Sequence, residues 1–253
     1  MKKLLVMLLT VLMFVSLTAC AKKEEAKVEE PTIETQEKTE SNEPTLDGPV
    51  AGGWTVYDEE PESQTSEEGM TACEKALEGL TGVGYRPYIE MGTQVVSGKN
   101  YMYLSKMTTV VPNAETELGV IVVYANLQGG AELLHVNKIN LGECAEAESE
   151  FASDKGLVGG WQVNENLVEG DLPEGAKEAF DKCTEGLLGV NYTPITLLGT
   201  QVVAGTNYAV LALRQTVTPD APKELCIMYI YADLKGNASL SNVYALNLAD
   251  FNK

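Results

Sequence analysis

Basic residues are scarce in this chain: 18 lysines and arginines stand against 37 acidic residues, which gives a formal net charge of −19. A chain this acidic repels nucleic acid and anionic lipid head groups. The sequence also has no stripe of basic residues with aromatic residues between them. We therefore expect no nucleic-acid partner.

Histidine is scarcer still, because His135 is the only one in the chain. A hydrolase normally needs a nucleophile, a base and a group that orients the base. A single histidine on an expected strand is more typical of a surface position. The HExxH, Walker, dinucleotide-binding and CxxC motifs are missing as well. We predict that the protein is not an enzyme and that it has no catalytic residue, metal site or cofactor.

The N-terminus has an apolar run, Leu4 to Leu17, that is too short to span a membrane comfortably. Lys2 and Lys3 precede it and small residues follow it, which predicts a signal peptide over residues 1–19. The segment Leu17-Thr18-Ala19-Cys20 resembles the bacterial lipobox, which implies an acyl chain such as palmitate on Cys20. The alternatives are an ordinary secretory signal or a buried apolar helix. We expect an extracytoplasmic protein of the cell envelope that touches the membrane through this lipid anchor alone.

The segment after Cys20 contains no aromatic residue up to position 49 and is rich in Glu, Lys, Thr and Pro. Such a composition cannot bury enough apolar surface to offset the entropy lost on folding. Residues 20–49 are therefore predicted to be the lipidated cysteine and a disordered acidic tether.

The rest of the chain is a duplication. Sliding the sequence by 107 positions aligns residues 52–141 (copy one) with 159–248 (copy two) without a gap, and 39 of the 90 aligned residues are identical. Such similarity is far above chance and indicates a duplicated domain. We predict a first domain over 50–141, a linker over 142–156 and a second domain over 157–253.

Both copies show the same pattern of elements. A short strand is expected at each Gly-Gly-Trp, and a helix follows, clearest in copy two after Pro173. Four β-rich segments complete copy two: 192–203, 207–217, 225–232 and 240–248. One helix must then cover one face of an antiparallel sheet. The predicted fold class is α+β, with each sheet wrapped on one helix.

Apart from Cys20, the chain has four cysteines, Cys73, Cys144, Cys183 and Cys226. Outside the cytoplasm an even number of cysteines can form disulfides, and four allow three pairings. The expected helix faces and strand faces favour Cys73–Cys144 and Cys183–Cys226. Four buried free thiols are the alternative.

One segment in each copy resembles a known inhibitor family. The run from Gln201 to Tyr208 (QVVAGTNY) resembles the first binding loop of cystatins, Gln-x-Val-x-Gly, and copy one repeats it from Gln94. The Gly-Gly-Trp before it resembles the glycine-containing N-terminal trunk of plant cystatins. The spacing from the second glycine to the glutamine is the same in both copies, 94 − 53 = 41 and 201 − 160 = 41.

The resemblance implies two tandem cystatin-like domains and a surface-anchored, monomeric inhibitor whose partner is a papain-like cysteine protease. Trunk and hairpin would together enter the protease cleft. The implied protease-binding residues are Gly52, Gly53, Gln94, Val95, Val96, Ser97 and Gly98 in copy one, and Gly159, Gly160, Gln201, Val202, Val203, Ala204 and Gly205 in copy two. The alternative is a non-inhibitory surface module for adhesion or ligand binding, in which the hairpin is an ordinary turn.

Overall fold

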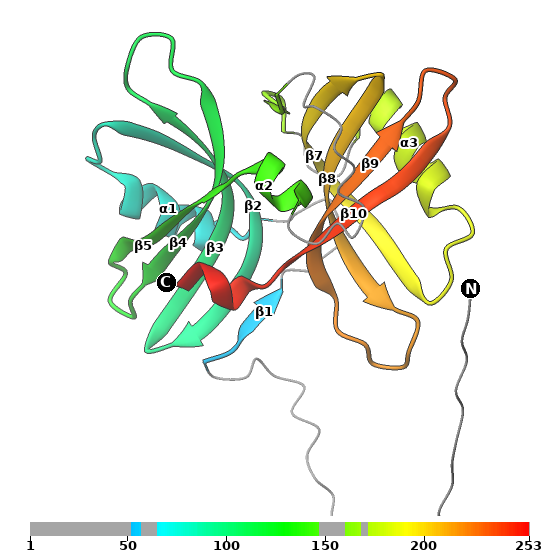
Figure 1. Cartoon of the computed structure of the whole chain (residues 1–253). Coiled ribbons are helices and arrows are strands. Elements are labelled where there is room, and N and C mark those ends of the chain that lie inside the picture. The colour runs from blue at the N-terminus through cyan, green and yellow to red at the C-terminus, as the bar shows by residue number, and fades with distance from the viewer. Residues whose placement is uncertain (1–51, 57–64, 147–159, 168–171, 253) are drawn as a thin grey trace, which may run out of the picture. The chain divides into compact units, whose positions relative to one another are not determined.

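The computed structural model describes residues 52–56, 65–146, 160–167 and 172–252. Each copy contributes a strand, a helix and four further strands (Figure 1), which confirms the predicted order of elements. Copy one contains β1 (Trp54–Val56), α1 (Glu67–Leu77), β2 (Val83–Val96), β3 (Gly98–Thr109), β4 (Thr116–Ala125) and β5 (Ala131–Ile139). Copy two contains β6 (Gln162–Val163), α3 (Glu174–Thr184), β7 (Val190–Val203), β8 (Gly205–Thr216), β9 (Glu224–Ala232) and β10 (Ala238–Leu246). A short helix, α2 (Leu141–Glu146), follows β5, and a 3-10 helix, η1 (Leu248–Asn252), follows β10.

The strands form two five-stranded antiparallel sheets. Sheet A has the order β1-β2-β3-β4-β5 and sheet B the order β10-β9-β8-β7-β6. The first strand of each copy is short and lies beside the end of the longest hairpin: β1 pairs with Gly92–Gln94, and β6 with Gly199–Thr200. The described residues of both Gly-Gly-Trp segments therefore lead into a strand next to the hairpin that the sequence singled out.

Helix α1 begins after Ser66, whose hydroxyl oxygen accepts a hydrogen bond of 3.1 Å from the backbone N–H of Gly69. This cap satisfies a helix-end donor, and the two acidic residues in the first turn suit the helix dipole. The helix buries Ala72, Cys73 and Ala76 on one face of sheet A. Helix α3 packs on sheet B in the same way through Ala176, Ala179, Phe180 and Cys183.

A buried carboxylate holds the start of α1 on sheet A. Glu90 is 2% exposed, and its carboxylate accepts hydrogen bonds from the Ser66 backbone N–H (2.9 Å), the Ser66 hydroxyl (2.6 Å) and the Tyr103 hydroxyl (2.8 Å). Copy two has Leu197, Pro173 and Val210 at the three equivalent positions. The start of the helix is thus held by hydrogen bonds in copy one, whereas apolar residues occupy the same positions in copy two.

The sheet faces that turn away from the helices are buried together in one shared hydrophobic core. Sheet A contributes Met91, Met102, Leu104, Val120 and Val122, and sheet B contributes Leu198, Leu211, Leu225, Ile227 and Tyr229, among others. Their central strands are therefore covered on both sides. This explains why Leu118–Val123 and Leu225–Ile230 are continuous buried runs and not alternating patterns.

This arrangement corrects the predicted fold class. The described residues are mostly antiparallel sheet, with 51% strand and 19% helix, and they form two five-stranded sheets with three α-helices. It is not a pair of α+β, cystatin-like domains, each with a sheet wrapped on one helix. The prediction was wrong because it assigned each sheet a single covered face, whereas the second face of each sheet is buried against the other copy.

Polar contacts also join the copies. The Tyr229 hydroxyl of copy two donates a 2.9 Å hydrogen bond to the Leu141 carbonyl oxygen of copy one, and within copy two the Trp161 ring meets the Tyr229 ring edge-on at 5.5 Å. The buried Lys106 ammonium of sheet A donates to the carbonyl oxygen of Glu165. These contacts satisfy polar groups at the border of the shared core.

The four described cysteines are free thiols, so neither of the favoured disulfides is present in this structure. Cys73 lies in the cluster beneath α1, whereas Cys144 packs against the shared core. These two positions are on opposite faces of sheet A, which separates their sulfur atoms. Cys183 and Cys226 do share the cluster beneath α3.

The predicted signal peptide (1–19), Cys20 and the tether (20–49) lie outside the described residues, as does most of the predicted linker (142–156). The first residues of that linker belong to α2. None of the helices in the described ranges is long and apolar enough to cross a membrane.

Candidate functional site

The β2–β3 hairpin of copy one carries the predicted loop at its tip. Val96 pairs with Gly98, which leaves Ser97 alone at the turn. Gly98 has a φ of +136°, and a Cβ at this position would overlap the carbonyl oxygen of Ala125. Only glycine fits this turn and its close approach to the neighbouring strand. Copy two repeats the geometry at Gly205, also at +136°.

The trunk of copy one is joined to this hairpin. The Gly52 backbone N–H donates to the Val95 carbonyl oxygen (2.9 Å), and the Gln94 side-chain amide donates to the Gly52 carbonyl oxygen (2.9 Å). Gln94 in turn accepts a 2.7 Å hydrogen bond from the Asn100 amide. The structure therefore brings the predicted trunk and loop residues of copy one together, although about 40 residues separate them in sequence.

Copy two shows the same hairpin with less of its trunk described. Asn207 donates a 2.8 Å hydrogen bond to the Gln201 side-chain oxygen, as Asn100 does to Gln94. Gly159 lies outside the described residues, and Gly160 is exposed, with open space where a Cβ would stand.

A second hairpin tip lies beside each loop, and the sequence analysis did not include it in the site. The Tyr124 hydroxyl of β4 donates to the Ser97 carbonyl oxygen (2.6 Å), and Tyr231 of β9 donates to the Ala204 carbonyl oxygen at the same distance. These bonds fix both loop tips to the neighbouring strand. The sequence does contain a trace of these bonds, because the two tyrosines, Tyr124 and Tyr231, are identical residues at equivalent positions of the two copies.

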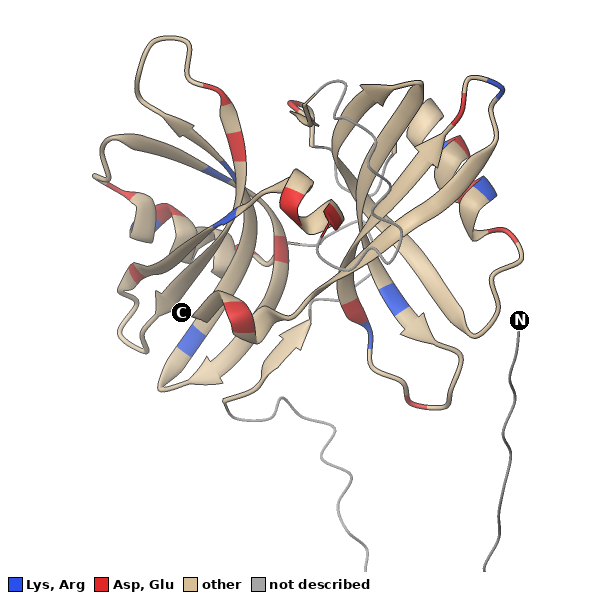
Figure 2. Ribbon diagram, in the orientation of Figure 1, with Lys and Arg blue, Asp and Glu red and all other residues tan. Residues whose placement is uncertain are grey.

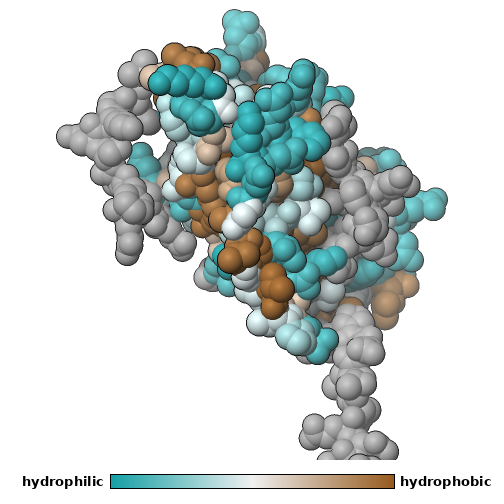
Figure 3. Space-filling model, turned by 90° about the vertical axis from the view of Figure 1, so that its right-hand side faces the viewer, coloured by the Kyte–Doolittle hydropathy of each residue, from teal (hydrophilic) through white to brown (hydrophobic). Residues whose placement is uncertain are grey.

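Apolar side chains stand exposed at these tips. Val96 is 40% exposed in copy one, and Val202 is 65% exposed in copy two. The neighbouring turns present Leu127 and Leu234, which are 79% and 86% exposed. Figure 3 shows that the hydrophobic patches on one face of the molecule are separated by hydrophilic surface. The two loops differ in detail, because Val96 is equivalent to Val203 and not to Val202.

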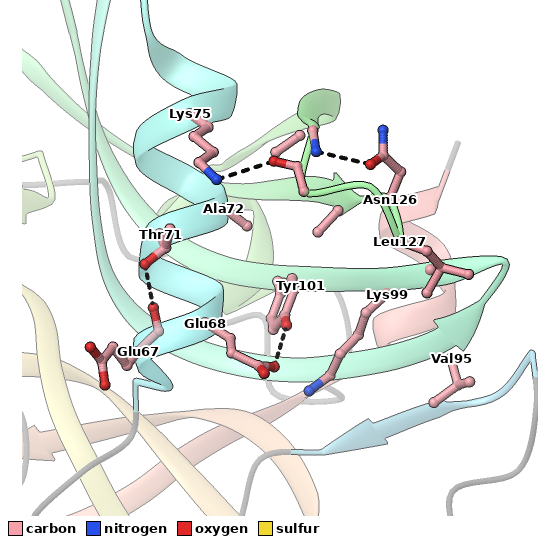
Figure 4. Close-up of a pocket in the computed structure, with 15 residues that line it drawn as sticks. Glu67, Glu68, Thr71, Ala72, Lys75, Val95, Lys99, Tyr101, Asn126 and Leu127 are labelled. Carbon is pink, nitrogen blue, oxygen red and sulfur yellow. Dashed lines mark hydrogen bonds between the residues drawn. The ribbon is translucent and has the colours of Figure 1, made fainter.

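A cavity of about 700 Å³ opens between α1 and the two hairpin tips of copy one (Figure 4). Lys75 of α1 closes one side by donating a 3.1 Å hydrogen bond to the Gly129 carbonyl oxygen. The Tyr101 hydroxyl donates to the Glu68 carboxylate (3.2 Å), and the Lys99 ammonium lies over the Tyr101 ring. Burial raises the pKa of Tyr101, and the nearby Glu68 charge raises it further, so the hydroxyl keeps its proton at neutral pH.

Within the described residues, no group of three or more His, Cys, Asp or Glu side chains is placed to hold a metal ion. The carboxylates are spread over the helices, turns and strands, and Asp and Glu outnumber Lys and Arg in the sequence (Figure 2). No protein-family model and no curated protein sequence matches this chain. The interpretation of the site therefore depends on its residues and their geometry.

Proposed function

We propose that the protein inhibits papain-like cysteine proteases by inserting the tips of its β2–β3 and β7–β8 hairpins into the protease cleft. In copy one the inserting residues are Gln94 to Gly98, together with the trunk glycines Gly52 and Gly53. In copy two they are Gln201 to Gly205, together with Gly159 and Gly160. The proposal extends to a monomer held at the cell envelope by lipid on Cys20.

The observation that carries this proposal is the pair of hydrogen bonds between Gly52 and the hairpin, through Val95 and Gln94. They join two segments that are distant in sequence into one edge before any partner arrives. A preorganised edge loses little conformational entropy when it binds, so more of the contact energy appears as affinity.

The composition of the edge also suits insertion into a cleft. Trunk glycines have no side chain, which allows close approach of a partner to the backbone. Val96 and Val202 offer exposed, β-branched apolar groups with restricted side-chain torsions. Leu127 and Leu234 add apolar surface on the adjacent turns.

The test is a papain titration with a double variant that changes only the exposed tips. We expect Val96→Asp with Val202→Asp to weaken inhibition at least tenfold, because a carboxylate would have to be desolvated in the cleft. The matched control is Val110→Asp with Val217→Asp, which changes equivalent residues that are 74% and 62% exposed in the β3–β4 and β8–β9 turns. Gly98 and Gly205 are unsuitable for this test, because any side chain there overlaps a neighbouring carbonyl oxygen.

If the double variant and its control inhibit papain equally, the hairpin tips do not take part in inhibition. Complete absence of inhibition by the folded wild-type chain would favour the second function, a surface module for adhesion or ligand binding. The cavity of copy one is the observation that supports this second function.

A further inference from the structure

The cavity of copy one has an aromatic floor that already carries a positive charge. The Lys99 ammonium lies 4.8 Å from the centre of the Tyr101 ring. In the described part of the chain, no carboxylate lies within ion-pair distance of this ammonium. The ammonium lies against the ring face, and the Glu68 carboxylate accepts the hydrogen bond of the Tyr101 hydroxyl at the edge of the same ring (Figure 4). The position of Lys99 thus shows that a cation can lie against the Tyr101 ring inside this cavity.

The charges around the cavity favour a cationic ligand over an anionic one. Glu67 and Glu68 stand exposed on the first turn of α1, at the rim. Of the two lysines that line the cavity, Lys75 is engaged by the Gly129 carbonyl oxygen, and Lys99 has a flexible stem that can swing away. The whole chain, at −19, attracts cations over a long range.

Copy two has the same frame without these features. Tyr208 and Lys182 repeat Tyr101 and Lys75, and Lys182 again donates to a turn carbonyl oxygen, that of Gly236 (3.0 Å). Glu68 and Lys99, however, correspond to Gly175 and Thr206. The turn bond is therefore common to both copies, and the paired charges around the tyrosine are specific to copy one.

We propose that this cavity binds the basic side chain, arginine or lysine, of a polypeptide partner. Tyr101 forms the floor, Glu68 and Glu67 supply the opposite charge, and Lys99 is an internal competitor that the ligand displaces. The occupant is a polypeptide because Leu127, exposed at the rim, offers apolar contact to the residues beside the basic one. The site goes beyond the proposed inhibition and does not depend on it.

The test is an NMR titration of the chain from residue 21 onward, which contains every described residue. The probe is N-acetyl-Leu-Arg-Leu-amide, whose only charge is the guanidinium. The control peptide has citrulline, the neutral isostere of arginine, in the middle position. We expect saturable shifts of the Ala72, Tyr101 and Leu127 amides with the arginine peptide, and binding about tenfold weaker with the citrulline peptide.

Variants of matched charge separate this site from general attraction to an acidic protein. Glu68→Gln keeps an acceptor for the Tyr101 hydroxyl and should weaken binding about fivefold, whereas Glu174→Gln in copy two should leave it unchanged. Lys99→Thr, which installs the residue of copy two, should strengthen binding about threefold, whereas Lys235→Thr on the second hairpin of copy two should not. Dispersed spectra of each variant establish that it is folded.

Three results would overturn the proposal. The first is no saturable shift at the cavity in the wild-type chain, and the second is equal binding of the arginine and citrulline peptides. The third is unchanged or weaker binding of the arginine peptide by Lys99→Thr, which would show that Lys99 does not compete with the ligand for the cavity. None of these results bears on papain inhibition, so the two proposals fail separately.

Discussion

Leu248, in the last described helix of the chain, packs against Gly92 of sheet A, where its side chain occupies the space that a Cβ of residue 92 would need. The same contact occurs with the two copies exchanged: Leu141, at the end of copy one, packs against Gly199 of sheet B. Both pairs are related by the repeat offset, since 92 + 107 = 199 and 141 + 107 = 248. Each copy thus extends its C-terminal segment over a glycine in the other copy's sheet.

Substitution of either glycine should destabilise the shared core. Gly92→Ala places a methyl group where it overlaps both the Leu248 side chain and the Thr55 carbonyl oxygen. We expect the free energy of unfolding to fall by about 1–3 kcal/mol in urea denaturation, because a packed core resists added volume. Gly199→Ala should behave alike, since it overlaps Leu141 and the Gln162 carbonyl oxygen.

Gly160→Ala is the control for this prediction, because nothing lies within 4 Å of the added Cβ. Its effect should stay within about 0.5 kcal/mol. If Gly92→Ala is as stable as Gly160→Ala, the packing of the C-terminal segments described above is incorrect.

Loss of the Glu90 carboxylate should be costly because three donors depend on it. Glu90→Leu leaves the Ser66 backbone N–H, the Ser66 hydroxyl and the Tyr103 hydroxyl without their buried acceptor. We expect the chain to lose about 3 kcal/mol of stability, measured by urea denaturation.

The triple variant Glu90→Leu, Ser66→Pro and Tyr103→Val installs the residues of copy two and removes all three donors that Glu90→Leu leaves unpaired. It should therefore be more stable than Glu90→Leu alone. Comparing the unfolding free energies of the single and combined variants measures the coupling between the three positions. Additive losses across the three positions would argue against a coupled network.

The repeat predicted the elements well, but it could not predict their partners. Hairpins and helices depend on local spacing, so Gly98 and Gly205 marked the same turn in both copies. The packing of Leu248 on Gly92 joins residues 156 positions apart (248 − 92), and nothing local in either segment encodes it. The predicted one-face coverage of each sheet failed for this reason.

The candidate site likewise has a part that the sequence predicted and a part that it did not. The trunk and first hairpin were visible as motifs, and the structure joins them in copy one through Gly52 and Val95. The cavity was not predicted, because Lys99, Tyr101 and Glu68 form no motif and meet only when α1 lies on the sheet. The difference between the copies at Glu68 and Lys99 was the one available signal.

Burial of the cysteines should make them slow to react. Loss of hydration raises the pKa of the Cys73 thiol to about 12, of Cys226 to about 12 and of Cys183 to about 11. The thiolate is the reactive form. At pH 8 we expect iodoacetamide to modify Cys144, which is only partly buried, well before the other three, as measured by mass spectrometry of native protein.

The same pKa shifts predict how stability depends on pH. The folded state keeps these protons while the unfolded chain, with thiols near 9.0, releases them. The free energy of unfolding should therefore be unaffected by these groups below pH 9 and should decrease between pH 9 and about pH 12. A flat profile over that range, or rapid alkylation of Cys73 at pH 8, would contradict the buried thiols of the structure.

The titration of wild-type chain, residues 21–253, against active papain tests the central claim most directly. Hairpin edges that are held in place before binding predict saturable inhibition at micromolar concentration or below, with a stoichiometry that gives the number of active copies. Full papain activity in the presence of 100-fold more of the folded chain than papain, at tens of micromolar, would contradict the proposed inhibition.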